Sequence, residues 1–241
     1  MSPLAWLTAH PIAHRGLHDA AQGIVENTPA AVAAAVAAGY GVEVDLQPSA
    51  DGEAMVHHDH VLGRLVEGRE ALRDLTAAEL KARRFHHTAD RMLTLGELLD
   101  LVGGRVPLLL ELKSRFDDNT IVAQRAAAVL AGSTAPVAVM SFDPALIISL
   151  RQAAPTIVCG LVGERRFTRI RPVGRRATML LDALRANPQF LAWRLQDLAT
   201  PLPRLARAIG YPLLTWTVRS PAERAVAMSL ADQVIFEGFR A

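Results

Sequence analysis

Short apolar runs alternate with helix-forming stretches through most of the chain, and this alternation limits the fold to a small set of α/β architectures. Val106 to Leu112 is apolar apart from Glu111, as expected of a strand that is buried on both faces of a parallel sheet. A helical pattern follows from Thr120 to Ala131 and stops at Gly132, and Val137 to Ser141 is again a strand. Such regular alternation favours a (β/α) barrel over two separate domains.

The length of 241 residues suits this architecture, because single α/β barrels commonly run to about 250 residues. With 51% hydrophobic and 21% charged residues, the chain can bury a sizeable core. We therefore predict an α/β fold, a distorted (β/α)8 TIM barrel formed as one domain by residues 1–241, with a short irregular insertion around 61–93. The sequence offers nine candidate strands where a barrel needs eight, so one of them must lie outside the barrel.

Several predicted helices carry clear signals at their ends. Thr28 as a cap and Pro29 as the first helical residue precede an Ala-rich stretch that runs to Ala38. Thr94 opens another helix, with Glu97 three residues later as in a capping box. These signals place the helices between the predicted strands.

Charge and cysteine content exclude few classes of partner. The formal charge is only +2, although the sequence pI is near 9.1, and the lone Cys159 excludes an intrachain disulfide and fits a reducing compartment.

Residues 1–10 lack a signal-peptide pattern, and no segment approaches the roughly 20 apolar residues that span a bilayer, so we expect a cytoplasmic location. Peripheral contact with a membrane surface stays compatible with this sequence, and nothing in it indicates an oligomeric state.

Polar side chains gather at the ends of the first two apolar runs. His14 and Arg15 end the run that starts at Ile12 and are followed by a glycine, as in a strand that delivers two polar side chains into a loop. Glu43 and Asp45 are two residues apart in the next run, so both carboxylates lie on one face of the strand. Two such carboxylates repel each other unless a cation lies between them, and Mg²⁺ and Ca²⁺ take oxygen ligands of this kind. The pair therefore predicts a metal site.

A turn signal at residues 51–52, Asp-Gly, links this strand to the run 54–58 in a predicted hairpin. If these two residues form the loop, the register sets Asp45 opposite His58. Because directly opposed residues share a face, His58 would then stand beside the two carboxylates. Pro48 cannot donate a hydrogen bond to the ladder, so the strand must be an edge, bulged or interrupted there.

Seven short blocks follow one another across nearly the whole chain: His14-Arg15-Gly16, Glu26-Asn27-Thr28, Glu43-x-Asp45, His58-Asp59, Glu111-Leu112-Lys113, Ser141-Phe142 and Trp216-Thr217-Val218. In this order and rough spacing they resemble the glycerophosphodiester phosphodiesterase family. The resemblance implies a TIM barrel with its site at the carboxyl ends of the strands. It also implies an enzyme that hydrolyses a small-molecule glycerophosphodiester to sn-glycerol 3-phosphate and an alcohol.

Two histidines and three carboxylates are the candidates for catalysis and metal binding. His14 and His58 are expected to be the general acid and base. His57 and His60 are near-neighbours that a register error could confuse with His58, and the His-Asp pair of the family selects His58. One divalent ion, Mg²⁺ or Ca²⁺, is expected on Glu43, Asp45 and Glu111, because Glu111 would be costly to bury unpaired in an apolar run.

Arg15 and Lys113 are candidates for phosphate contacts, since Arg can bind two oxygens of a phosphodiester and Lys acts as a point charge. The alternative is that they pair with Glu26 and Glu111 and balance buried charge, and both readings can hold in the empty enzyme. The resemblance makes Glu26 a substrate-site residue as well. It also places the ring of Trp216 near the substrate, although a Trp in such a strand could instead belong to the core.

Two departures from the family pattern leave the substrate range open. Leu62 to Gly68 stands where many members carry an Arg-Thr-Thr run, and Phe236 to Phe239 replaces a Thr-Asp-x-Pro block. A lysophospholipase D or a phospholipase C-like enzyme on a lipid substrate is therefore an alternative. A second alternative is a non-catalytic module that binds a phosphate ligand or a membrane surface through the arginines between residues 165 and 176. Nucleic acid is not expected there, because that segment lacks aromatic residues beyond Phe167.

Overall fold

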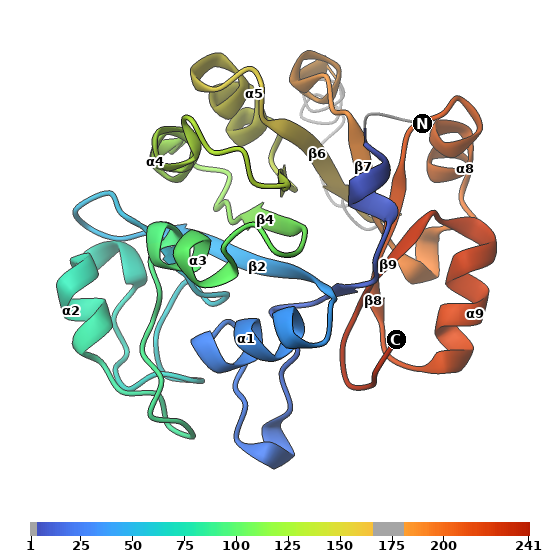
Figure 1. Ribbon diagram of the computed structural model, residues 1–241. Helices are drawn as coiled ribbons and strands as arrows, with labels where there is room; N and C mark the ends of the chain where they lie inside the picture. The colour runs from blue at the N-terminus through green and yellow to red at the C-terminus, as the bar shows by residue number, and fades with distance from the viewer. Residues whose placement is uncertain (1–3, 166–180) are drawn as a thin grey trace.

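A computed structural model describes residues 4–165 and 181–241 of the chain. Strand β1 pairs with β9 on one side and with β2 on the other, which closes eight parallel strands into a barrel. Figure 1 shows these strands at the centre of the molecule. Their bounds are Ile12–Ala13 (β1), Gly41–Pro48 (β2), Leu108–Leu112 (β4), Val137–Ser141 (β5), Val158–Gly163 (β6), Phe190–Arg194 (β7), Leu213–Val218 (β8) and Gln233–Phe236 (β9). The predicted (β/α)8 barrel is confirmed.

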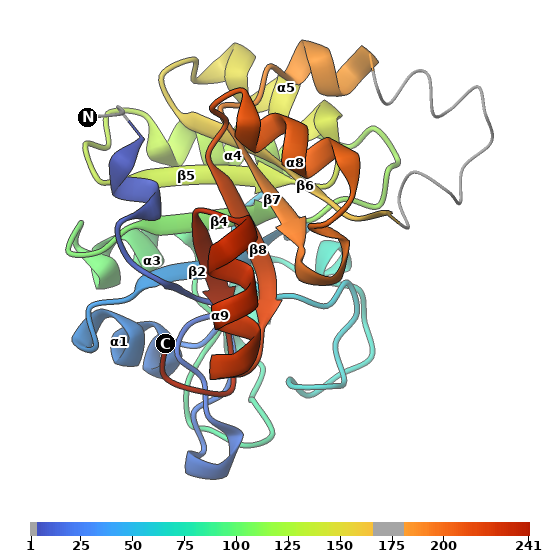
Figure 2. The same ribbon diagram turned by 90° about the vertical axis from the view of Figure 1, so that its right-hand side faces the viewer.

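Helices surround the barrel and cover the outer face of the sheet (Figure 1). Figure 2 gives the view in which α8 and α9 face the reader, and α8 packs on β8 while α9 packs on β8 and β9. The helices of the barrel wall are α1 (Pro29–Ala37), α3 (Leu95–Val102), α4 (Ile121–Leu130), α5 (Pro144–Ala153), α8 (Pro201–Ala208) and α9 (Pro221–Leu230). No helix in the described ranges is long and apolar enough to cross a membrane.

The helix ends follow the signals in the sequence. The Thr28 hydroxyl accepts a hydrogen bond from the Ala31 amide at the start of α1, and Thr94 forms a capping box with Glu97 at the start of α3. Sequence reasoning did not predict α9. Its signal was present, because Ser220 caps the helix and Pro221 is its first residue.

The ninth strand, β3 (Ala54–Val56), lies outside the barrel and pairs antiparallel with the end of β2. The predicted hairpin therefore exists, but its predicted register is wrong by one residue. Pro48 pairs with Ala54, and the His57 amide donates to the Asp45 carbonyl, so His57 rather than His58 is opposite Asp45. The turn contains three residues instead of two, with Gly52 at a positive φ of 79°. Pro48 is the last residue of β2, where a missing donor costs little.

The inside of the barrel is filled by apolar side chains from its strands. Ile12, Leu109 and Phe190 belong to one buried cluster, and Leu7 from the 3₁₀ helix η1 (Ala5–Thr8) joins it. Gly160 of β6 gives the ring of Phe190 its space, because a Cβ atom at Gly160 would lie 2.4 Å from the Phe190 ring. Close packing of this kind fills the space between the strands β6 and β7.

Residues 61–93 connect β3 to α3 and contain the 3₁₀ helix η3 (Leu72–Asp74) and the helix α2 (Ala77–Ala82). Helix α2 lies apart from the ring of helices in Figure 1. The segment has a buried apolar cluster of its own, which includes Leu62, Leu72 and Leu80. The segment spans the residues of the predicted insertion, and the division of the chain into one domain with this insertion stays a prediction. Two further 3₁₀ helices in the described part of the chain are η2 (Ala20–Gln22) and η4 (Leu195–Asp197).

Candidate active site

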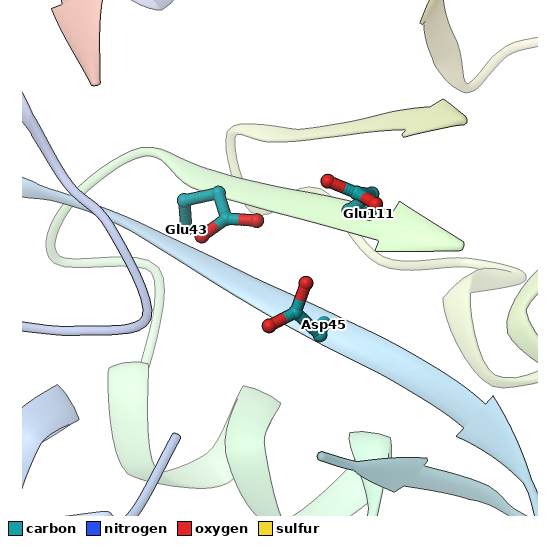
Figure 3. Close-up of side chains that lie close together, drawn as sticks. All are labelled: Glu43, Asp45 and Glu111. Carbon is teal, nitrogen blue, oxygen red and sulfur yellow. The ribbon is translucent and has the colours of Figure 1, made fainter. Parts of the chain in front are cut away.

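Three buried carboxylates face one another near the carboxyl end of the barrel. Glu43 and Asp45 project from the same face of β2, and Asp45 is paired in register with Glu111 on the neighbouring strand β4. Each of the three residues offers an oxygen that lies within 4.8 Å of the other two. Figure 3 shows the side chains of both strands directed into the same space. The strand pairing thus brings together the three predicted metal ligands.

The charges of this cluster are only partly compensated by the protein. Burial, together with the nearby Asp45 and Glu111, raises the pKa of Glu43 well above its usual value. Burial also raises the pKa of Asp45, but Lys113 and Arg15 outweigh it and hold that pKa below its usual range. Oxygen Oε1 of Glu43 is buried and has no hydrogen-bond partner among the described residues. A buried, unpartnered carboxylate oxygen beside two further carboxylates fits a hard divalent cation.

The two predicted phosphate ligands border the carboxylates. Nζ of Lys113 lies 2.8 Å from Oδ1 of Asp45 and 2.6 Å from Oε1 of Glu111. Arg15 Nη1 is 2.7 Å from Glu26 Oε1, and Arg15 Nε is 3.3 Å from Asp45 Oδ2. Pairing of these cations with Glu26 and Glu111 is therefore present, as the charge-balance reading predicts. Both cations still lie where an anionic ligand above the cluster would meet positive charge.

The loop that carries Arg15 is held in an unusual backbone conformation. Arg15 has a φ of 56° and Asn27 a φ of 58°, which is the left-handed region, and the Asn27 amide donates to the Arg15 carbonyl. The residue after Arg15 is a glycine because its Cα packs on α1. A Cβ atom on Gly16 would lie 2.7 Å from the backbone of Ala31. The Asn27 side chain donates to Asp45 Oδ2 at 2.8 Å. Sequence reasoning named Asn27 only as part of a motif and missed its bond to Asp45.

His14 is held by a carboxylate from the other end of the chain. Its Nδ1 lies 2.5 Å from Oε2 of Glu237, and its Nε2 lies 4.0 Å from Oε2 of Glu43. Arg219 binds the other oxygen of Glu237 at 2.8 Å. Sequence reasoning missed Glu237, although it stands in the block that departs from the family pattern, where an acidic residue is usual.

His58 is held in a similar way by its neighbour. Its Nδ1 lies 2.8 Å from Oδ1 of Asp59, whose other oxygen accepts from Arg64 Nε at 2.6 Å. Arg64 also donates to Glu26 at 2.7 Å, and so joins the loop after β3 to the loop after β1. A positive charge on His58 is close enough to Asp45 to lower the pKa of the Asp45 carboxyl. Sequence reasoning also missed Arg64, although this residue lies in Leu62 to Gly68, one of the two segments that depart from the family pattern.

His57 has a different environment from His58 despite its position opposite Asp45 in the ladder. It is buried, its Nδ1 has no hydrogen-bond partner among the described residues, and burial lowers its pKa to about 4. A histidine in this state stays neutral at neutral pH. The half-exposed His58 is therefore the better candidate for proton transfer.

Trp216 lies on β8, away from the strands that carry the carboxylates. Its ring meets Phe142 edge to face, with ring centroids 5.5 Å apart, and its Nε1 donates to the Ala192 carbonyl at 3.1 Å. The ring is partly buried and packs against the cluster inside the barrel. Contact of this ring with the core is thus present, and its contact with a substrate stays a prediction.

Five of the arginines in the predicted basic segment lie outside the described residues: Arg166, Arg169, Arg171, Arg175 and Arg176. The amide of Arg165 donates to Asp197 at 2.8 Å. The surface-binding reading of this segment stays a prediction.

Comparison with known sequences assigns the chain to a family. The sequence model of the glycerophosphoryl diester phosphodiesterase family matches residues 14–238. A Mycobacterium tuberculosis protein named "Probable glycerophosphodiester phosphodiesterase 1" is 30% identical over 216 residues, which cover 77% of this chain and 78% of that protein. A glycerophosphodiester phosphodiesterase of Caldanaerobacter subterraneus is 34% identical over 113 residues, 43% of this chain and 44% of the relative.

Solved structures share the fold. An Oleispira antarctica phosphodiesterase in complex with the product sn-glycerol-3-phosphate superposes with a TM-score of 0.78, at 21% identity, over 96% of this chain and 94% of that chain. A Thermotoga maritima glycerophosphodiester phosphodiesterase has a TM-score of 0.72, at 24% identity, over 93% and 92% of the two chains. At these identities the likeness supports the barrel fold.

Proposed function

Since the chain belongs to the glycerophosphoryl diester phosphodiesterase family and is therefore a phosphodiesterase, we propose that it hydrolyses glycerophosphodiesters to sn-glycerol 3-phosphate and an alcohol in a metal-dependent reaction. The product named for the Oleispira antarctica relative supports this choice of substrate class. We further propose His14 and His58 as the general acid and base, and Glu43, Asp45 and Glu111 as the ligands of one divalent ion, Mg²⁺ or Ca²⁺.

One observation carries the proposal: two histidines, each with Nδ1 bound to a carboxylate, border a cluster of three buried carboxylates. A carboxylate on Nδ1 keeps a proton on that nitrogen, so Nε2 is free to accept or give a proton at the site. Two histidines prepared in this way can serve a reaction in which one proton is removed and another is supplied.

The reaction begins with the 2-hydroxyl of the glycerol moiety. This hydroxyl attacks phosphorus while one of the histidines takes its proton, and the other histidine protonates the oxygen of the leaving alcohol. One P–O bond forms and the P–O bond to the alcohol breaks, which gives a cyclic phosphate and the free alcohol. Water then opens the cyclic ester, with the proton transfers reversed, and releases glycerol 3-phosphate.

The remaining site residues stabilise charge and orient the reacting groups. Glu43, Asp45 and Glu111 would hold a divalent ion, and such an ion would supply positive charge to the substrate and lower the pKa of its attacking hydroxyl. Arg15 and Lys113 stabilise the charge that develops on the phosphate oxygens. Glu26 holds Arg15 and Arg64 in place, and Trp216 offers an apolar wall to the substrate.

The test is release of glycerol 3-phosphate from glycerophosphocholine and glycerophosphoethanolamine by the purified protein, with EDTA, with Mg²⁺ and with Ca²⁺. Product that depends on metal is the expected result. Release of the head group from lysophosphatidylcholine alone would instead favour a lysophospholipase D. A folded protein that binds phosphate esters but turns over none of these substrates with any metal would favour the non-catalytic module.

A further inference from the structure

Gln47 is a buried polar residue at the carboxyl end of β2, and the proposed reaction gives it no role. It lies on the same face of the strand as Glu43 and Asp45, because strand side chains alternate with a period of two. Two residues of a strand rise about 6.6 Å, so Gln47 is the next inward side chain above Asp45. It thus extends from the strand that carries two of the three carboxylates.

The carboxamide of Gln47 binds the loop that carries His58. Its Nε2 donates to the carbonyl oxygens of His57 at 3.1 Å, His58 at 2.8 Å and Asp59 at 2.7 Å. Its Oε1 lies 2.5 Å from Nδ1 of His60, which donates to it. One side chain therefore contacts four consecutive residues, with His58 second among them.

This arrangement has a clear electrostatic reason. Three consecutive carbonyl oxygens that point to one place repel each other and need a donor between them, and the two N–H bonds of a carboxamide supply it. The three carbonyls and the bond from His60 together fix which end of the amide faces the carbonyls. The reverse orientation would place Oε1 against three oxygens and the amide nitrogen against the N–H of His60. A buried acceptor without a donor is unfavourable, so this loop conformation depends on Gln47.

We propose that Gln47 is a positioning residue that fixes the imidazole of His58 relative to the carboxylate cluster. It does so by tying the backbone on both sides of His58 to β2, the strand that presents Glu43 and Asp45. The bond between His58 and Asp59 sets the ring orientation, and Gln47 sets where the backbone of both residues stands. The inference rests on the proposed function, since it assigns His58 to proton transfer.

Two substitutions test the donor role. Gln47→Met has nearly the same shape and removes both donor and acceptor, whereas Gln47→Glu keeps an acceptor for His60 and removes the amide donor. Each is expected to lower kcat for glycerophosphocholine hydrolysis by about tenfold to a hundredfold, as small misplacements of a catalytic group do, with KM within about twofold. Gln124→Glu, an isosteric change on the exposed face of α4, is the matched control and should leave both constants unchanged.

A readout other than turnover separates positioning from general destabilisation. Hydrogen exchange in the metal-free protein should quicken in segment 57–62 of both Gln47 variants while the amides of β4 to β6 keep their protection. If a Gln47 variant does not fold, His60→Leu serves instead, because it removes the hydrogen bond to Oε1 of Gln47 and leaves the donor to the three carbonyl oxygens in place. It is expected to give a smaller loss of kcat and the same local pattern of exchange.

The outcomes distinguish this inference from the proposed function. Wild-type protein that releases no glycerol 3-phosphate with any metal contradicts the proposed function, whereas exchange in segment 57–62 still reports on the loop. Active wild-type enzyme with unchanged kcat and unchanged local exchange in both Gln47 variants overturns the inference. A rise in KM alone would overturn it as well, because Gln47 would then act on substrate binding.

Discussion

Nδ1 of His14 lies 2.5 Å from Oε2 of Glu237, and this bond joins residues that are 223 positions apart in the sequence. It forms because β1 and β9 are neighbours in the closed barrel, so their carboxyl ends meet. Burial raises the pKa of Glu237, but hydrogen bonds from His14 and His18 and the charge of Arg219 outweigh it, and the pKa falls well below its usual value. Glu237 therefore stays ionised and stabilises positive charge on His14.

Glu237→Gln should lower kcat by at least about tenfold, because the neutral amide no longer stabilises a protonated His14 and can present a donor to Nδ1. Steady-state kinetics on glycerophosphocholine check this prediction. Asp182→Asn, which removes a surface carboxylate that pairs with Arg185, is the control and should behave as wild type. Equal kcat values for Glu237→Gln and wild type would show that His14 needs no carboxylate partner.

Glu43→Gln should abolish the rise in melting temperature that Mg²⁺ or Ca²⁺ gives to the wild-type protein. Metal that binds only the folded state stabilises it, and the substitution removes a charged ligand oxygen from the cluster of Glu43, Asp45 and Glu111. Thermal unfolding with and without EDTA measures the shift. Glu53→Gln, which loses a surface ion pair with Arg125, should retain the full shift. An undiminished shift in Glu43→Gln would place the metal elsewhere.

His57 predicts a pH dependence of stability in the metal-free protein. Its pKa is about 4 in the folded chain because of burial, against an ordinary value of 6.5, so the unfolded chain binds more protons between these two values. The free energy of unfolding should therefore decrease as pH falls from about 6.5 to about 4, by on the order of 3 kcal/mol from this residue. Denaturant unfolding at several pH values measures it. His57→Leu should flatten the profile in this window, whereas His10→Gln should not; a steep profile in both would implicate other groups.

Gly160→Ala should destabilise the barrel by about 1–3 kcal/mol, because the added methyl group would overlap the ring of Phe190 on β7. Chemical denaturation measures the loss. Gly96→Ala in α3 is a matched control, since its nearest contact would be at 3.9 Å and alanine favours the helix. Phe190→Leu in the Gly160→Ala background should recover part of the loss. Unchanged stability of Gly160→Ala would mean that the strands move apart at low cost.

The barrel could be predicted from the sequence because its strands are strongly apolar and its helices carry end signals such as Thr28-Pro29. The count of nine strands also identified an extra one, which is β3. The hairpin register could not be fixed in this way, because two-residue and three-residue turns both suit an Asp-Gly sequence. A shift of one residue exchanged His57 for His58 opposite Asp45.

At the candidate site, the sequence predicted the residues that bear charge at the ends of strands, and the fold brings Glu43, Asp45 and Glu111 together. It did not predict their partners. Glu237, Arg64 and Asn27 act through contacts across loops or across the closure of the barrel, and only the three-dimensional arrangement gives those contacts. Gln47 was missed because a single glutamine in a strand carries no distinctive pattern.

The central claim is that His14 and His58 carry out proton transfer beside a metal at the three carboxylates. The most direct measurement is glycerol 3-phosphate release by wild type, His14→Ala and His58→Ala in the presence of the metal that supports turnover. The account predicts that each substitution lowers release by orders of magnitude, while the melting temperature and the metal-induced shift stay close to wild type. Near-normal release by both folded variants would contradict it.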